Sequence, residues 1–242
     1  MDYEEISYGN NRAISREQEL DAQLAFPALM RKVYVWMSLA LVITGLAAYV
    51  VATSPVLLNA IFSNSIVFWG LIIAELVLVI GLSAAINKLS LTTATLMFVL
   101  YSVVNGATMA SIFLVYAASS IAQVFFITAG TFAVMAFIGY TTKSDLTSIG
   151  KISLMAVIGL IIAGIVNIFV QSSMFSLIIS GIGVLVFVGL TAYDAQKIKQ
   201  MLMTAGDTGE GAQKLALLGA LSLYLDFINL FLYLLRLLGR RE

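Results

Sequence analysis

Three acidic residues lie inside long apolar segments of this sequence: Glu75, Asp194 and Asp226. A carboxylate surrounded by hydrocarbon is costly, so each acid must be protonated, share a proton with a neighbour, or be neutralised by a bound cation. No Lys or Arg lies at a comparable depth. These residues can therefore bind protons or cations, or, as a structural alternative, hydrogen-bond helices together as neutral acids. We favour that structural role most for Glu75.

Asp194 and Asp226 lie in consecutive apolar segments. If their carboxyl groups approach each other, repulsion and burial will make the pair titrate as a unit, with a response to pH near neutrality. In a simple hairpin about residues 204–211, Asp194 lies ~6 residues closer to the turn than Asp226, an offset of ~9 Å. Contact therefore requires a helix shift, a tilt or an asymmetric loop.

Asp226 belongs to a stripe on the last apolar segment, Lys214–Leu238. Small or polar residues recur there at spacings of three and four: Gly219, Ser222, Asp226, Asn229, Tyr233 and Arg236. On an α-helix this spacing places them on one face. Lipid cannot satisfy polar groups, so that face must turn toward other protein or a water-filled gap. We therefore expect the last helix to lie inside a bundle.

Other polar residues could line the same interior. We take Ser222, Asn229 and Asn105 as accessory candidates for an ion path, together with Glu75 and Lys88. Taken singly, a residue such as Asn105 is better explained by a hydrogen bond between helices. In the polar loop at residues 139–146, Ser144 and Asp145 are suited to cap the following helix.

The composition indicates a polytopic membrane protein. The chain is 61% hydrophobic and 11% charged, which leaves too little polar surface for a soluble globule. It has no Cys and no His, which excludes disulfides, zinc sites of the usual kind and His-based catalysis. Thirteen basic residues balance thirteen acidic ones, so nothing suggests a nucleic-acid partner. The expected surroundings are a lipid bilayer, and the sequence points to no particular protein partner.

We divide the chain into a mobile cytoplasmic tail at residues 1–31, a membrane domain at 32–238 and a short basic tail at 239–242. The first tail has no apolar core of the kind a signal peptide needs. The membrane domain contains about seven apolar segments, each near the ~20 residues that a bilayer requires. They are Lys32–Thr53, Ser65–Ile86, Leu91–Tyr116, Ile121–Tyr140, Ile152–Val170, Phe175–Ile198 and Lys214–Leu238.

The connections between these segments also carry information. Very short ones join the third segment to the fourth and the fifth to the sixth, which predicts antiparallel helical hairpins. Pro55 fits a turn after the first segment.

Basic residues predict the orientation of the chain. They cluster before the first segment and in alternate loops, while the three intervening loops contain no Lys or Arg. By the positive-inside rule the N-terminus is cytoplasmic, in a bacterial inner membrane or an organellar membrane. A seventh span then exports Arg236, Arg240 and Arg241, against the rule. We favour a true seventh span over a re-entrant segment, because no helix-breaking residue such as Pro interrupts Leu215–Leu238.

Two motifs resemble the paired signatures of the transmembrane Bax inhibitor motif family. They are Tyr-Asp-Ala-Gln-Lys-Ile-Lys at residues 193–199 and Leu-Ser-Leu-Tyr-Leu-Asp-Phe-Ile-Asn-Leu-Phe at residues 221–231. The resemblance extends over all seven segments and includes Glu75 and the loop at 139–146. It implies an all-α integral membrane protein with six helices around a central C-terminal helix, and a pH-sensitive calcium leak. It also implies that Asp194 and Asp226 form the pH sensor at the pore.

The sequence departs from that family at one position. Members with a basic latch for the aspartate that matches Asp194 place an Arg eleven residues after the acid that matches Glu75. Here that position is Ile86, and Lys88 follows two residues later. An ammonium cannot reproduce the bidentate pairing of a guanidinium, so a latched closed state is in doubt.

Other functions stay open as alternatives. An intramembrane aspartyl protease also uses two Asp on consecutive helices, but Asp226 lacks the Gly-x-Gly-Asp context of that class. A proton- or cation-coupled transporter and a non-conducting regulator or scaffold are both compatible with membrane acids. We expect a non-enzymatic calcium leak without a resident cofactor, in which Asp194 and Asp226 control the path and contact the permeating Ca²⁺ transiently through hard oxygen ligands.

Overall fold

The computed structural model describes residues 3–205 and 208–241 of the chain, with side chains from residue 25 onward. The described chain is helical apart from short turns and one isolated bridge between Tyr116 and Arg241. Its helices are α1 (Tyr3–Thr53), α2 (Pro55–Phe62), α3 (Ser65–Ala85), α4 (Leu91–Met109), α5 (Ala118–Thr141), α6 (Thr147–Val170), α7 (Ser173–Met203) and α8 (Glu210–Leu238), with a 3₁₀ turn at Ala110–Leu114.

Seven of these helices are long and apolar enough to cross a membrane, which confirms the predicted fold class. The segments predicted from the sequence agree with them to within a few residues at most ends. Bulky apolar side chains such as Ile66, Phe169 and Leu185 are exposed on their outer surfaces, as expected for helices that face lipid. The protein is therefore an integral, multi-pass membrane protein.

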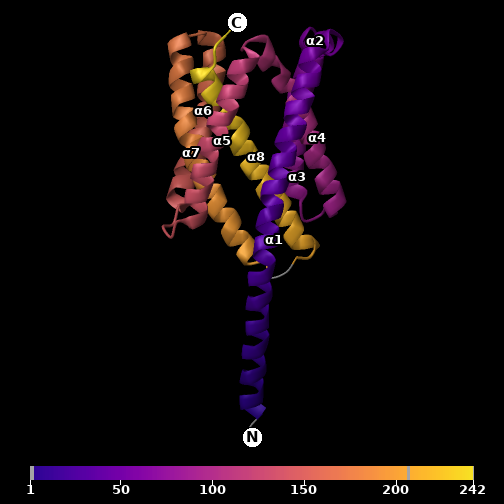
Figure 1. The fold of residues 1–242 in the computed structure, drawn as a ribbon, viewed down its shortest axis with the longest axis vertical. Helices are drawn as coiled ribbons and strands as arrows, with labels where there is room; N and C mark the ends of the chain where they lie inside the picture. The colour runs from indigo at the N-terminus through magenta and orange to yellow at the C-terminus, as the bar shows by residue number, and fades with distance from the viewer. Residues whose placement is uncertain (1–2, 206–207, 242) are drawn as a thin grey trace.

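Helix α8 is the central element of the bundle. In its most apolar stretch 67% of the residues are buried, against at most 39% in any other span. It packs against α7, α1, α5 and α4, while α3 packs chiefly on α4 and α6 on α7 (Figure 1). The stripe at spacings of three and four therefore marks a helix inside a bundle, as predicted. Its 29 continuous residues are long enough for a full span, without a re-entrant turn.

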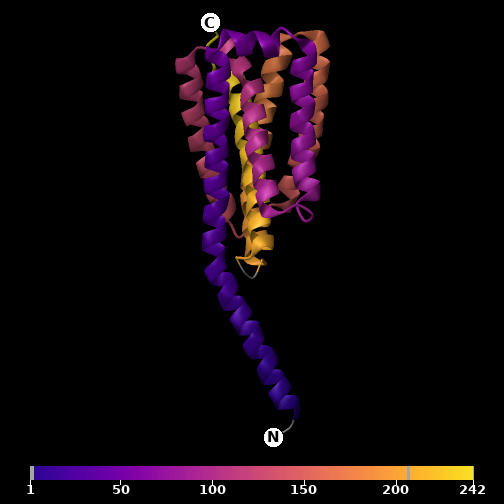
Figure 2. The ribbon, with the colours of Figure 1, turned by 90° about the vertical axis from the view of Figure 1, so that its right-hand side faces the viewer.

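Helix α1 begins far before the first predicted span. It is continuous from Tyr3 to Thr53, with Pro27 inside it. Figure 2 shows its N-terminal part projecting beyond the bundle, with a bend where the helix leaves the other elements. A Pro inside a helix removes one backbone hydrogen bond and favours such a bend. The segment expected to be a mobile tail thus has helical backbone, while its mobility and the domain boundary at residue 32 stay predictions.

A second difference is α2, where the sequence suggested only a turn at Pro55. The Ser54 side chain accepts a hydrogen bond from Leu57 N (3.4 Å), and Pro55 occupies the first turn of the helix. Pro is well suited there because the first helical N–H groups have no partner within the helix. The α4–α5 and α6–α7 connections are short, as predicted, and Gln171 ends α6 in the left-handed conformation (φ 52°).

Candidate functional site

Helices α7 and α8 make the most extensive helix–helix contact in the bundle. Two glycines allow their close approach. A Cβ added to Gly183 would lie 2.6 Å from the Tyr233 ring, and one added to Gly219 would lie 3.0 Å from Ile198. Larger residues at either position would push the helices apart. These contacts hold the central helix and its neighbour at a fixed antiparallel register.

That register decides how the two aspartates face each other. It places Asp226 level with Leu190 and Asp194 level with Ser222, an offset of about four residues or ~6 Å along the helix axis. A symmetric hairpin would separate the acids slightly further, so a small shift of α7 against α8 brings them closer. The two carboxyl groups lie within electrostatic range of each other.

Asp226 is an unusually placed side chain for an acid. It is only 5% exposed, and its Oδ2 atom is buried without a hydrogen-bond partner among the described residues. A buried ionised oxygen in that position is strongly unfavourable. Asp226 must therefore carry a proton or have its charge balanced by a cation.

Asp194 has a different environment. It is half-buried, and Lys197, one turn further along α7, is the basic group that acts on it electrostatically. Lys197 is exposed and lies 5.8 Å from the centre of the Tyr193 ring. Asp194 thus lies between a deeply buried acid and a solvated base, which suits a group that passes protons or cations between water and the interior.

The α5–α6 loop is bound directly to helix α7. The Gln196 side chain is 7% exposed; its Oε1 accepts a hydrogen bond from Leu146 N (2.9 Å), and its Nε2 donates one to Ser144 O (2.8 Å). Lys199 Nζ donates to Tyr140 O at 2.8 Å. These contacts fix the ends of α5 and α6 to α7 within about two turns of its aspartate.

Sequence reasoning did not find Gln196 or Lys199 as site residues. Both fall within the 193–199 motif, but a glutamine and a lysine near a helix end look like solvated residues in a sequence. The predicted side-chain cap is wrong, because the N-cap of α6 is Leu146; Asp145, one residue earlier, instead accepts a hydrogen bond from Thr147 N through its Oδ1 (2.9 Å). Hydrogen bonds from the Thr147 hydroxyl and backbone hold the pKa of the exposed Asp145 carboxyl below its usual value.

Glu75 forms a separate polar cluster. Its Oε1 accepts a hydrogen bond from Thr108 Oγ1 (2.5 Å) and its Oε2 one from Asn105 Nδ2 (3.4 Å). Asn105 Oδ1 in turn accepts from the Tyr224 hydroxyl (3.0 Å), which lies 2.6 Å from Thr44 Oγ1. Glu75 and Asn105 are therefore brought together by α3 and α4, in a network that reaches α8 and α1.

A cavity of about 540 Å³ adjoins this network and is lined by Glu75, Asn105, Ser111 and Arg236, among others. A basic residue thus does share a cavity with one of the membrane acids, contrary to the expectation from depth alone. No ion pair joins Arg236 to Glu75 in the described part of the chain. Tyr224, fully buried at the centre of the network, was missed because its sequence neighbours are apolar.

Two accessory candidates on α8 lie apart from the Glu75 cluster. Asn229 is half-buried and donates a hydrogen bond to Leu225 O of its own helix (2.8 Å). Ser222 is half-buried and level with Asp194. Of these two residues, Ser222 is therefore the one that lies beside the aspartate of α7.

The basic residue that follows the latch position makes no ion pair among the described residues. Lys88 is exposed in the α3–α4 turn, and Ile86, at the latch position itself, is buried in the apolar core. Among the described residues the one ion pair joins Lys214 to Glu210. Lys88 therefore does not latch the α7 aspartate in this structure.

Comparison with known proteins shows which family this chain resembles. The family model described as "Inhibitor of apoptosis-promoting Bax1" matches residues 27–242. The chain is 49% identical over 215 residues to "Inner membrane protein YbhL" of Escherichia coli K12, a match that covers 88% of this chain and 92% of the relative. It is 45% identical over 229 residues to a protein of Borreliella burgdorferi, covering 95% and 99%. The match across all seven spans shows that this chain belongs to the Bax inhibitor family.

Proposed function

We propose that the protein is a non-enzymatic calcium leak whose conduction is controlled by protonation of Asp194 and Asp226. The observation that carries the proposal is the buried Asp226 Oδ2, which has no hydrogen-bond partner among the described residues and lies within electrostatic range of a second carboxyl group. Two acids that cannot both be ionised at low cost attract a divalent cation when deprotonated and lose that attraction when protonated. Conduction should therefore rise with pH.

In this proposal Ca²⁺ is the ion that the protein conducts, and it is not a bound cofactor. No cluster of three or more Asp, Glu, His or Cys side chains that could hold a metal exists among the described residues. Two carboxylates are fewer oxygen ligands than a resident Ca²⁺ takes, which is usually about 6–8 including waters. Asp194 and Asp226 would thus hold a partly hydrated ion only in passage.

The location and orientation belong to the same proposal. We infer an inner-membrane location from the likeness to an inner membrane protein of E. coli. The distribution of basic residues among the loops supports a cytoplasmic N-terminus.

The experiment is calcium flux into liposomes that contain the purified protein, measured at a series of pH values with an internal dye. The wild type should conduct more at high pH, and Asp226→Asn and Asp194→Asn should each remove most of the pH dependence. Leu225→Asn serves as the control for a new polar group on α8 outside the pair. Flux that keeps its pH profile in both aspartate variants would remove the pair from the mechanism.

The main alternative is a proton- or cation-coupled transporter, supported by the further acid at Glu75 and its network across four helices. The same liposomes distinguish the two functions. A leak dissipates a calcium gradient and stops at equilibrium. A coupled transporter accumulates calcium against its gradient when a proton gradient is applied. Accumulation of calcium against its gradient would show that the protein is a coupled transporter and not a leak. The absence of flux under every condition would favour a regulator or scaffold.

A further inference from the structure

A long apolar groove separates α1 from α5 on the outside of the bundle. Both helices pack against α8, but they do not pack extensively against each other. Two cavities, of about 570 and 560 Å³, lie between them and share Met37 and Phe132 as lining residues. The second cavity reaches Phe227 of α8, so the groove extends from the edge of the bundle to its central helix.

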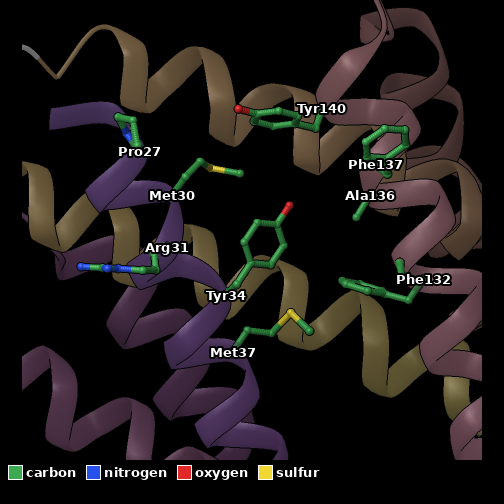
Figure 3. Close-up of a pocket in the computed structure, with 10 residues that line it drawn as sticks. Pro27, Met30, Arg31, Tyr34, Met37, Phe132, Ala136, Phe137 and Tyr140 are labelled. Carbon is green, nitrogen blue, oxygen red and sulfur yellow. The ribbon is translucent and has the colours of Figure 1, made fainter. Parts of the chain in front are cut away.

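One end of the groove has a defined mouth. The Phe26 and Tyr140 rings stack there with centroids 6.3 Å apart, and Arg31 lines the space beside them. Figure 3 shows the Tyr34 hydroxyl pointing into the space between α1 and α5, while the Arg31 guanidinium, one turn earlier on α1, points away from α5. Tyrosines at a span end are typical of the membrane–water boundary.

The dimensions of the groove fit one hydrocarbon chain. From Arg31 to Gly45 the lining follows α1 for about fourteen residues, which is ~21 Å. One leaflet contributes half of a ~30 Å hydrocarbon core, so a chain anchored at the mouth can lie along the groove. Each cavity also has the volume of a small-molecule site.

The charges of the residues at the mouth of the groove indicate which lipid head group it would bind. Arg31 is exposed and forms no ion pair in the part of the chain whose side chains are described. Lys199 lies 4.9 Å from the centre of the Tyr140 ring, which adds a second basic residue at the mouth. Within the described chain, neither cavity is lined by an acidic residue. We propose that the α1–α5 groove is a binding site for an anionic phospholipid, with an acyl chain along Met37 and Phe132 and the phosphate at Arg31.

The site connects lipid to the central helix. Phe227, next to Asp226 in the chain, packs against Phe125 and Phe132 of α5 with centroids 5.4 Å apart in each pair. An acyl chain in the groove therefore contacts the ring that neighbours the buried acid. The lipid site does not depend on the calcium function, because the binding can be measured whether or not the protein conducts.

The experiment is photo-cross-linking of the full-length protein in nanodiscs with phosphatidylglycerol or phosphatidylcholine that carries a diazirine on the acyl chain. Cross-links should concentrate on peptides around Met37 and Phe132, with about a fivefold preference for the anionic lipid. Ala133→Trp should fill the groove and remove these cross-links. Ala84→Trp, at an exposed alanine of α3, should leave them unchanged.

The head-group assignment has its own pair of variants. Arg31→Gln should abolish the preference for phosphatidylglycerol, while Lys151→Gln, an exposed basic residue at the start of α6, should preserve it. Cross-links spread evenly over all lipid-facing helices would overturn the site. An undiminished preference in Arg31→Gln would overturn the phosphate contact. Lipid cross-links at Met37 and Phe132 that appear in nanodiscs with one copy of the chain and vanish in nanodiscs with two copies would replace the lipid site by a dimer interface.

Discussion

Glu75 and Asp226 are both acids inside the bundle, but their surroundings are opposite. Glu75 accepts hydrogen bonds from Thr108 and Asn105 and belongs to a connected polar network. Asp226 is more deeply buried, and its Oδ2 has no hydrogen-bond partner among the described residues. The first arrangement resembles the hydrogen bonds that hold membrane helices together. In the second arrangement no described residue donates a hydrogen bond to the buried oxygen, so a proton or a cation has to balance its charge.

An acid in a membrane span is therefore not informative by itself. Its role depends on whether neighbouring helices supply donors. On α4, two donors face Glu75. Beside Asp226, the neighbouring ionisable group is Asp194, another acid. We therefore infer a structural role for the α3–α4 cluster and ion or proton binding for the α7–α8 pair.

Calcium conduction should show the greatest change. Asp226→Asn should lower calcium flux at high pH by about tenfold or more, because one unit charge near a divalent ion in a protein interior contributes several kcal/mol. Glu75→Gln should change flux by less than about twofold, since an amide preserves most of the network. Liposome flux measures both. Equal losses in the two variants would show that the two acids do not differ in role.

Substitutions of Glu75 should lower the stability of the protein more than substitutions of Asp226, which is the reverse of their expected effects on calcium flux. Glu75→Ala leaves the Asn105 and Thr108 donors without their acceptor and should lower the free energy of unfolding by about 1–3 kcal/mol. Asp226→Asn removes a buried unpaired acid and should leave stability unchanged or raise it. Thermal unfolding in detergent gives both values. A strong destabilisation by Asp226→Asn would mean that Asp226 has a structural partner.

The loop beside Asp194 allows a test of what positions that acid. Gln196→Ala removes two hydrogen bonds to the α5–α6 loop and should cost about 1–2 kcal/mol. Amide hydrogen exchange at Leu146 should accelerate as the loop loosens. Gln200→Ala, one turn further on at an exposed position, is the control and should change neither. Protection of Leu146 that survives Gln196→Ala would show that the loop is held by other contacts.

A smaller loss of stability should follow removal of the Tyr224 hydroxyl, which links the Glu75 network to α8. Tyr224→Phe removes the bridge between Thr44 and Asn105 while preserving the ring, and should lower stability by about 1 kcal/mol. Tyr49→Phe, on the exposed face of α1, should have no measurable effect. Thermal unfolding again provides the comparison, and equal midpoints for the two variants would remove Tyr224 from the network.

The helices and the central position of α8 could be predicted because both depend on local patterns. Span length follows from the thickness of hydrocarbon, and the stripe containing Asp226 follows from helical periodicity. The register of α7 against α8 could not be predicted. It depends on contacts such as Gly183 against Tyr233, which join residues far apart in the chain.

Hydrogen bonds between helices were predicted for Glu75 and Asn105, but their partners on α8 and α1 could not be predicted, for the same reason. Tyr224 lies in an apolar stretch, and its partners Thr44 and Asn105 come from α1 and α4. Gln196 likewise appears in the sequence as an ordinary polar residue near a helix end, yet the fold buries it against a loop fifty residues earlier. Patterns within one helix predict which face is buried, but not which polar groups meet there.

Control of conduction by Asp226 can be tested through the protonation state of the carboxyl group itself. Infrared difference spectra of the protein labelled with ¹³C-aspartate report the carbonyl stretch of protonated carboxyl groups as pH is raised. We predict a band that is absent in Asp226→Asn, unchanged in Glu75→Gln, and lost over the same pH range in which calcium flux rises. A band that does not change over that range, while flux does, would contradict control of conduction by this pair.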